Sequence, residues 1–353
     1  MKVIPNIFEL PQQLAAGEEI TGDDVEKSES SASTPSNTET PTSTTTTTAG
    51  AITTKSSSSS TSSSITSPGN LQPLSLIGHS RSAEATYFQI PQLSTNIDMG
   101  FIDKKYMNQH PNTFLITHTH ADHSYYLSAC QPAFINRKVP NRVFVPKENV
   151  KFVENFLHAC QELNAGKELP RESVQERKPV QVIGVSPGDV IEKIGGKENF
   201  VARVVRCDHS IVCNGYAIYE KKKKLKKEFS HLKGAEIGKM RKELGEDAVC
   251  DTIFEPRIAI MGDTTYRVFE MNPELLEFPA IVVECTFLEE GQEEQALGAY
   301  HMHWNHLKPI VEKYSNIHFI LTHFSLRYTD EFILDFFAKQ NVKNVTPLVD
   351  DKF

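Results

Sequence analysis

Short apolar runs recur along the chain from residue 86 onward, and polar or turn-forming residues separate them. Runs of this length and composition are typical of β-strands. We predict strands at Thr86–Ile90, Thr113–Ile116, Arg142–Val145, Val180–Val185, Phe200–Val205, Arg257–Met261, Ile281–Val283 and His318–Leu321.

Between these runs, apolar residues recur every three or four positions, as they do on one face of a helix. Lys147–Ala165 has this pattern, and Gly166 supplies a stop signal. A second helix is predicted from an N-cap at Thr329 through Phe336. Strands mixed with helices predict a layered α/β protein.

The first 70 residues lack such patterns. From Ser28 to Ser67, 28 of 40 residues are Ser or Thr, and almost nothing is apolar. Such a tract cannot offset the entropy that ordering costs, so it is expected to be disordered. We therefore predict a disordered tail at residues 1–70 and one large folded domain at residues 71–353.

Composition narrows the class of protein further. The chain has 37 Lys and Arg against 45 Asp and Glu, a net charge of −8, and no apolar stretch approaches the roughly 20 residues of a membrane span. The first thirty residues lack the basic start and apolar core of a secretion signal, and early acids such as Glu18 and Glu19 are unusual in organellar transit peptides. The six cysteines form no Cys-x-x-Cys pair, which indicates free thiols. These features predict a protein of the cytoplasm or nucleus without a membrane segment.

One segment departs from this acidic background. Lys221 to Glu243 holds ten Lys or Arg and three Glu, a net charge of +7. Such a basic segment would attract a polyphosphate backbone, although a solvated surface explains the charge equally well. The candidate substrate-binding residues are Lys221, Lys222, Lys223, Lys224, Lys226 and Lys227.

A cluster of metal-ligand residue types follows the predicted strand at Thr113–Ile116. His118 and His120 alternate and can point to one metal, while Asp122 and His123 can reach a neighbouring one. Neutral imidazole and carboxylate groups suit zinc and related ions. Four such residues within six positions therefore predict a metal site.

Three more candidates each lie just past the end of an apolar run: His209, Asp263 and His323. Loops at one edge of a sheet converge, so these side chains can join the first cluster. Asp263 suits a bridge because a carboxylate has two oxygens. Two metals roughly 3.5–4 Å apart would hold a shared hydroxide and stabilise charge on a phosphoryl or carbonyl oxygen, which predicts hydrolysis.

The series His118, His120, Asp122, His123 resembles the signature of the metallo-β-lactamase superfamily, which implies an αββα sandwich of two mixed sheets flanked by helices. Finer motifs resemble ribonuclease Z, the tRNA 3′-processing endonuclease, in its short plant-like form. These motifs are Ile77-Gly78-His79-Ser80, Ile97-Asp98-Met99-Gly100, Cys207-Asp208-His209-Ser210 with Gly215-Tyr216, Gly262-Asp263-Thr264 and His323-Phe324-Ser325-x-Arg327-Tyr328.

The resemblance implies two zinc ions per subunit, with manganese or magnesium as alternatives. One ion would be held by His118, His120, His209 and Asp263, and the other by Asp122, His123, Asp263 and His323. Asp122 would also orient or deprotonate the attacking water.

The resemblance also implies a general acid that protonates the leaving oxygen. Glu284 and His301 occupy the positions of the pair that does this in the family. The chain reads Tyr300-His301-Met302-His303 there, so His303 is an alternative acid unless it packs beside Trp304.

The basic segment falls where the family inserts an arm, here at 220–246, that grips tRNA in a homodimer. The resulting hypothesis is an endoribonuclease that removes the 3′ trailer from precursor tRNA by metal-hydroxide attack. One alternative is a dinuclear phosphodiesterase for a small phosphodiester or cyclic nucleotide. Another is an RNA-binding module with a structural metal site, although such sites are usually closed and mononuclear.

Overall fold

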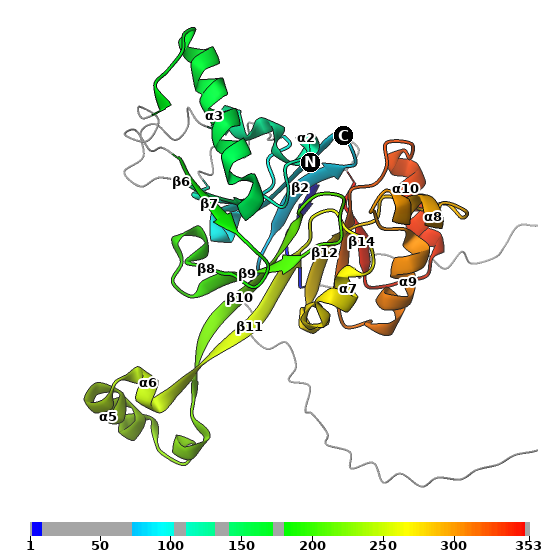
Figure 1. Cartoon of the computed structure of the whole chain (residues 1–353). Coiled ribbons are helices and arrows are strands. Elements are labelled where there is room, and N and C mark those ends of the chain that lie inside the picture. The colour runs from blue at the N-terminus through cyan, green and yellow to red at the C-terminus, as the bar shows by residue number, and fades with distance from the viewer. Residues whose placement is uncertain (1, 9–72, 102–110, 131–140, 172–179, 350–353) are drawn as a thin grey trace, which may run out of the picture. The chain divides into compact units, whose positions relative to one another are not determined.

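Two mixed β-sheets of seven strands each make up the centre of the described structure. The computed structural model describes residues 2–8, 73–101, 111–130, 141–171 and 180–349 (Figure 1). The first sheet has the order β1 (Lys2–Ile4), β2 (Leu76–Arg81), β3 (Ala85–Ile90), β4 (Thr95–Ile97), β5 (Thr113–Leu115), β6 (Asn141–Pro146), β7 (Val180–Val185). Its pairs are antiparallel from β1 to β4 and parallel from β4 to β7.

The second sheet is mixed in the same way. Its order is β14 (Val345–Pro347), β13 (His318–Thr322), β12 (Ala280–Glu284), β11 (Cys250–Ile260), β10 (Asn214–Leu225), β9 (Phe200–Arg206), β8 (Val190–Glu192). Pairs from β8 to β11 are antiparallel, and pairs from β11 to β14 are parallel. All eight strands predicted from the apolar pattern are present, and that pattern did not predict the six others in the described ranges.

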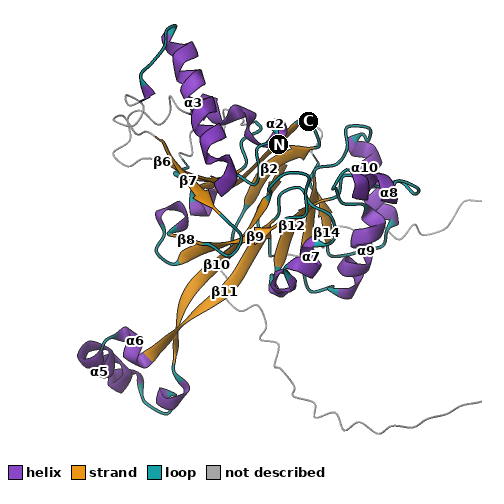
Figure 2. Cartoon of the chain, viewed as in Figure 1, coloured by secondary structure: helices purple, strands orange, loops and turns teal. Residues whose placement is uncertain are grey.

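The described helices flank the sheets, apart from two that lie at the end of a two-stranded ribbon (Figure 2). They are α2 (Ala121–Ser124), α3 (Val150–Ala165), α5 (Gly234–Leu244), α6 (Glu246–Val249), α7 (Val268–Met271), α8 (Glu293–Gly298), α9 (Trp304–Lys313) and α10 (Asp330–Lys339). Both predicted helices form. Gly166 caps α3 in the left-handed region at φ 64°, and the Thr329 side chain accepts a hydrogen bond from the Phe332 amide at the start of α10.

Three apolar clusters hold these layers together. The inner cluster joins both sheets, with Phe88 and Leu115 from the first and Ile218 and Val282 from the second. The outer face of the second sheet packs on α7, α9 and α10, and the outer face of the first packs on α3. Because each layer buries its apolar face against the next, the predicted αββα sandwich is confirmed. No helix in the described ranges is long and apolar enough to cross a membrane.

The predicted boundary of the N-terminal tail is corrected by residues 2–8. β1 pairs with β2 in the register Lys2↔Gly78, and the Ile7 side chain is fully buried in the inner cluster. The apolar residues that begin the chain therefore add an edge strand to the first sheet. The rest of the predicted tail, residues 9–70, lies outside the described residues. The described residues within Met1–Ala15 and Pro73–Phe353 form one compact unit.

β10 and β11 continue beyond the sheet as a two-stranded ribbon. β9 pairs with β10 only as far as Glu220, whereas β11 pairs with β10 as far as Leu225↔Cys250. The ribbon carries α5 and α6 at its end (Figure 1). We call residues 221–254 the arm. It lies where residues 220–246 were predicted to form one, and it includes the returning strand.

Candidate metal centre

The candidate site lies where strands of both sheets end. β5, β9, β11 and β13 each lead into a loop or short helix that carries predicted ligands, and the carboxyl ends of neighbouring parallel strands share one edge of a sheet. The structure brings all seven predicted ligands into two adjoining groups. Their members are His118, His120, His209 and Asp263 in the first group, and Asp122, His123 and His323 in the second.

The first group has three imidazoles around one carboxylate. His120 Nδ1 lies 3.1 Å from His118 Nε2 and 3.2 Å from His209 Nε2. Asp263 Oδ2 lies 3.7 Å from His118 Nε2 and 3.9 Å from His209 Nε2. Three nitrogens and one oxygen that face a common centre form a donor set that fits a tetrahedral zinc ion.

The second group adjoins the first through Asp263. Asp263 Oδ1 lies 3.3 Å from His123 Nε2, and its Oδ2 lies 3.4 Å from His323 Nε2. His323 Nε2 also lies 3.4 Å from Asp122 Oδ2. The two carboxylate oxygens of Asp263 therefore face ligands of both groups, as a bridging carboxylate must.

The short helix α2 carries Asp122 and His123, and the main chain just after β4 packs closely against it. A Cβ placed on Gly100 would lie only 1.7 Å from the backbone oxygen of Asp122. The backbone amide of Met99 also donates to the carbonyl of His123 at 2.7 Å. Gly100 is thus required by a close approach of main chain to main chain.

Asp98 is a supporting residue to which sequence reasoning assigned no role. Its Oδ2 lies 2.8 Å from His123 Nδ1, and its Oδ1 accepts from the Thr117 amide at 2.7 Å. The Thr117 hydroxyl lies 3.0 Å from His118 Nδ1. Such partners fix the ring orientation of ligand histidines. Asp98 directly follows β4, so the rule that found His209 would have found it, but a three-residue strand is too short to recognise by pattern.

Two other ligand histidines are oriented in the same way. His209 Nδ1 lies 3.1 Å from the carbonyl oxygen of Tyr300, and His323 Nδ1 lies 3.1 Å from the hydroxyl of Thr286. In each case the partner occupies Nδ1 and leaves Nε2 toward the centre.

The electrostatics of the centre favour a bound cation. Burial lowers the pKa of His118 well below 6.5, and it also lowers the pKa of His120 and His209. Burial alone would raise the pKa of Asp263, but His123 and His323 hold it well below 3.8. Burial would lower the pKa of His123, yet Asp263 and Asp98 raise it well above 6.5. The ionised carboxylates thus hold a proton on His123, while His118, His120 and His209 stay neutral. A metal ion that displaced this proton would supply the positive charge that the carboxylates attract.

Glu284 and His301 border the second group. Glu284 is buried at the end of β12, and its Oε1 lies 2.8 Å from His301 Nδ1. The same carboxylate accepts hydrogen bonds from the amides of Thr264 and Met302. The His301 ring stacks on that of His323 with centroids 5.3 Å apart.

His303, the alternative acid, is engaged within the fold. Its Nδ1 accepts from the amide of Asn305 at 3.0 Å, and its Nε2 donates to the carbonyl of Glu289 at 2.8 Å. The side chain is fully buried at the N-cap of α9. Both ring nitrogens are therefore occupied away from the metal ligands.

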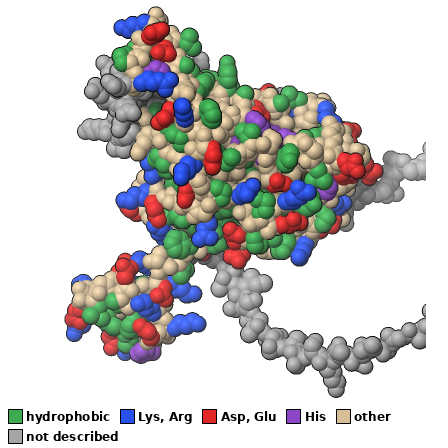
Figure 3. Space-filling model, in the orientation of Figure 1, with side chains coloured by type: hydrophobic (Ala, Val, Ile, Leu, Met, Phe, Trp, Pro, Cys, Tyr) green, Lys and Arg blue, Asp and Glu red, His purple; other side chains and the backbone are tan. Residues whose placement is uncertain are grey.

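The six predicted substrate-binding lysines do not join this centre but lie along the arm, where basic and acidic side chains are interspersed (Figure 3). Lys221, Lys222 and Lys223 pair with Glu192, Glu255 and Asp247. Lys226 donates to the carbonyl of Ala248 at 2.9 Å. Among the residues the structure describes, Lys224 and Lys227 form no ion pair.

The two packed sheets and the His/Asp centre at their edges define a metallohydrolase of the metallo-β-lactamase fold. The sequence is 31% identical over 296 residues to the chloroplastic tRNase Z of Arabidopsis thaliana, a match that covers 79% of this chain and 76% of that protein. A second tRNase Z of the same plant is 28% identical over 273 residues, covering 75% of this chain and 88% of that protein. The chain belongs to the tRNase Z family.

Similar solved structures include the short form of human tRNase Z, with a TM-score of 0.41 at 15% identity, covering 80% of this chain and 92% of that one. They also include a long-form RNase Z from yeast, with a TM-score of 0.46 at 14% identity, covering 79% of this chain and 38% of that one. No protein-family model matches the chain.

Proposed function

We propose that this chain is a zinc-dependent endoribonuclease that removes the 3′ trailer from precursor tRNA. The observation that carries the proposal is the position of Asp263, whose Oδ1 lies 3.3 Å from His123 Nε2 and whose Oδ2 lies 3.7 Å from His118 Nε2. One carboxylate that borders two ligand groups supports a dinuclear centre. The relatives named tRNase Z support precursor tRNA as the substrate.

The proposed centre holds two zinc ions, with manganese or magnesium as alternatives. When bound, two such ions lower the pKa of water and offset negative charge on the phosphate. The first ion is assigned to His118, His120, His209 and Asp263, and the second to Asp122, His123, Asp263 and His323.

Asp122 is assigned to the attacking water. Its Oδ2 accepts a hydrogen bond from the Ala83 amide at 2.9 Å and lies 3.4 Å from His323 Nε2. Burial would raise the pKa of Asp122, but the hydrogen bond with His323 and the charge of His123 lower it below its usual value. The carboxylate is therefore ionised at neutral pH, so it can orient the water and accept its proton while the water oxygen bonds to phosphorus.

His301 is assigned to the leaving group. Burial would lower its pKa, but the Glu284 carboxylate and its hydrogen bond raise the pKa of His301 to about 9. The imidazolium is thus present at neutral pH and donates its proton to the 3′-oxygen as the phosphorus–oxygen bond breaks. The products are a tRNA with a 3′-hydroxyl and a trailer with a 5′-phosphate.

The arm is assigned to RNA binding through its lysines. Lys224 and Lys227 are the lysines best placed to contact phosphates directly. Lys221, Lys222 and Lys223 can exchange their present partners for phosphate, because exposed ion pairs contribute only about 0–1 kcal/mol. Lys226 can exchange its hydrogen bond to the carbonyl of Ala248 in the same way.

We also propose a homodimer in which the arm of one subunit serves the active site of the other, as the resemblance to ribonuclease Z implies. Light scattering of the purified chain tests this, and a monomeric mass at working concentration contradicts it. The proposed location is the cytoplasm, the nucleus or both, since the lysine run at Lys221–Lys224 also suits nuclear import. A fluorescent fusion tests the location, and signal confined to chloroplasts or mitochondria contradicts it.

The function itself is tested by cleavage of an end-labelled precursor tRNA with zinc-loaded protein. The expected result is one cut directly after the discriminator nucleotide, lost in His118→Ala. The zinc content of each protein is measured in parallel. A folded, zinc-replete protein that hydrolyses a small phosphodiester but leaves precursor tRNA intact would contradict the proposal and favour the small-substrate alternative.

A further inference from the structure

The turn between β2 and β3 contacts two ligand-bearing segments that lie about 200 positions apart in the sequence. The amide of Ala83 donates to Asp122 Oδ2 at 2.9 Å. The amide of Ser82 donates to the carbonyl of Phe324 at 3.2 Å, directly after His323. One turn is therefore attached both to Asp122 and to the segment that begins with His323.

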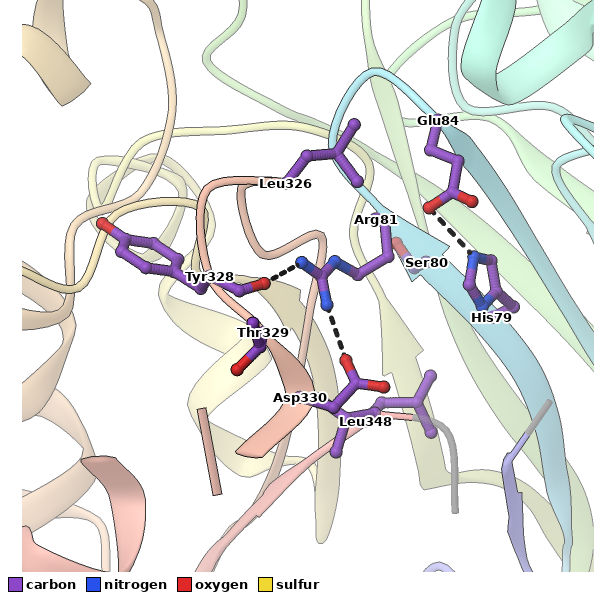
Figure 4. A pocket seen from close by; sticks show the side chains of 10 residues that line it. His79, Ser80, Arg81, Glu84, Leu326, Tyr328, Thr329, Asp330 and Leu348 are labelled. Carbon is purple, nitrogen blue, oxygen red and sulfur yellow. Dashed lines mark hydrogen bonds and ion pairs between the residues drawn. The ribbon is translucent and has the colours of Figure 1, made fainter. Parts of the chain in front are cut away.

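Arg81 strengthens the second attachment. Its Nη2 donates to the carbonyl of Ser325 at 3.0 Å and also to the carbonyl of Tyr328. Its Nη1 donates to Asp330 Oδ1 at 2.7 Å (Figure 4). The planar guanidinium thus holds two carbonyls of the 325–328 segment and the first residue of α10 from two separate nitrogens, whereas the donors of an ammonium group all lie on one nitrogen.

His323 needs such support because its backbone is strained. The residue has φ 59°, in the left-handed region that non-glycine residues rarely adopt. Such a conformation persists only where the surroundings hold it in place. The segment from Phe324 to Tyr328 provides that hold through Arg81 and Ser82.

Arg81 is nevertheless within reach of solvent. It is only 9% exposed, but it lines a pocket of about 360 Å³ together with His79, Glu84, Leu326 and Thr329 (Figure 4). Water would therefore fill the space that a shorter side chain left. Water can satisfy the freed carbonyls, but it cannot fix their positions relative to Asp330.

We propose that Arg81 is a positioning residue for the second metal site: it fixes the backbone that presents His323, while the turn it begins holds Asp122. This inference rests on the proposed dinuclear centre. It assigns Arg81 no contact with substrate. It predicts that loss of the Arg81 contacts weakens the site of Asp122, His123 and His323 and spares the site of His118, His120 and His209.

The test is a zinc titration of metal-free, full-length protein against a chromophoric chelator. Arg81→Lys retains the positive charge but loses the planar guanidinium and its second nitrogen donor. Asp330→Asn retains the shape of the side chain but loses the negative charge that pairs with Arg81. In both variants the zinc affinity that Asp122→Ala also weakens is expected to fall roughly 10- to 100-fold, the usual effect of removing support from a ligand. Asp122→Ala shows the titration curve expected when the second site is lost, and His120→Ala shows the curve expected when the first site is lost.

Arg142 offers a matched control. Its guanidinium also holds two backbone carbonyls, those of Glu192 and Lys193, and it contacts the Thr113 hydroxyl. Arg142→Lys is expected to bind two zinc ions with wild-type affinities. A matching loss in Arg142→Lys would show that the effect is general and would overturn the proposal.

The remaining outcomes separate this inference from the metal assignment. Circular dichroism establishes which variants are folded, and Asp330→Asn decides the question if Arg81→Lys does not fold. Two zinc ions bound with wild-type affinities in the folded variants would overturn the role of Arg81 and leave the dinuclear centre intact. Fewer than two zinc ions in the wild type would overturn the metal assignment and this inference together.

Discussion

Nδ1 of His301 lies 2.8 Å from Oε1 of Glu284, and the carboxylate is held in turn by the amides of Thr264 and Met302. The pair is therefore oriented from both sides before any substrate binds. His303, two positions along, has both ring nitrogens engaged with Asn305 and Glu289. The two histidines make the first prediction a matched comparison.

His301→Ala is expected to slow single-turnover cleavage of precursor tRNA by about 10²- to 10⁴-fold, the usual contribution of a general acid. His303→Asn, which retains an N-cap residue for α9, is expected to cleave at close to the wild-type rate. A substrate with sulfur in place of the 3′-oxygen needs little protonation, so it should restore most of the rate of His301→Ala. Equal rates for His301→Ala on both substrates would remove His301 from the role of acid.

The pH dependence follows from the same pair. Glu284 raises the pKa of His301 to about 9 against the opposing effect of burial. Because the protonated form is the active one, the rate should persist through neutral pH and fall as the pH rises through about 9. In Glu284→Gln the pKa of His301 should drop, so the fall should begin at lower pH. The measurement is the rate of single-turnover cleavage as a function of pH. A fall in rate at the same pH in wild type and in Glu284→Gln would contradict the prediction.

Asp263 and Asp98 should respond differently to the same substitution. Asp263→Asn removes charge from a carboxylate that borders both ligand groups, so both ions and activity should be lost even in excess zinc. Asp98→Asn alters only the support of His123 and Thr117, so zinc affinity should fall roughly 10- to 100-fold and added zinc should restore cleavage. Zinc content by mass spectrometry checks both. Rescue of Asp263→Asn by zinc would exclude its bridging role.

Two deletions test the N-terminal region. Removal of Ser28–Ser67 retains β1 and Ile7, so cleavage and the free energy of unfolding should stay unchanged. Removal of residues 1–70 also takes Ile4 and Ile7 out of the inner cluster. At about 1.5–3 kcal/mol for each buried side chain, this should lower the free energy of unfolding by roughly 3–6 kcal/mol. Urea unfolding distinguishes the two, and equal stability of the deletions would mean that β1 contributes nothing.

The arm can be tested by charge reversal. Lys224→Glu with Lys227→Glu is expected to weaken binding of precursor tRNA and to make its dependence on salt concentration shallower, because phosphate contacts release counterions. Hydrolysis of a small phosphodiester should be unaffected. Lys343→Glu, an exposed lysine outside the arm and next to the edge strand β14, is the control. An unchanged dissociation constant in the double variant would exclude these two lysines from RNA binding.

Local sequence was enough for much of the fold and most of the centre. His118, His120, Asp122 and His123 come from one short segment after β5, so their closeness in the sequence brings them together. β1, β4 and β14 were missed because three-residue strands have too few positions to show a pattern. The pairing of β1 also depends on β2, which lies far away in the sequence and begins at Leu76.

The sequence by itself determined the layered class, the helix caps and the type of chemistry, because periodicity, capping and ligand spacing are local properties. Only the tertiary structure decided which of His301 and His303 faces the metal ligands, since adjacent loop residues can point in opposite directions. It alone joined Arg81 to the segment after His323, across 244 positions between Arg81 and Ser325. Contacts of that range are set by how the two sheets pack, and no local pattern of residues records them.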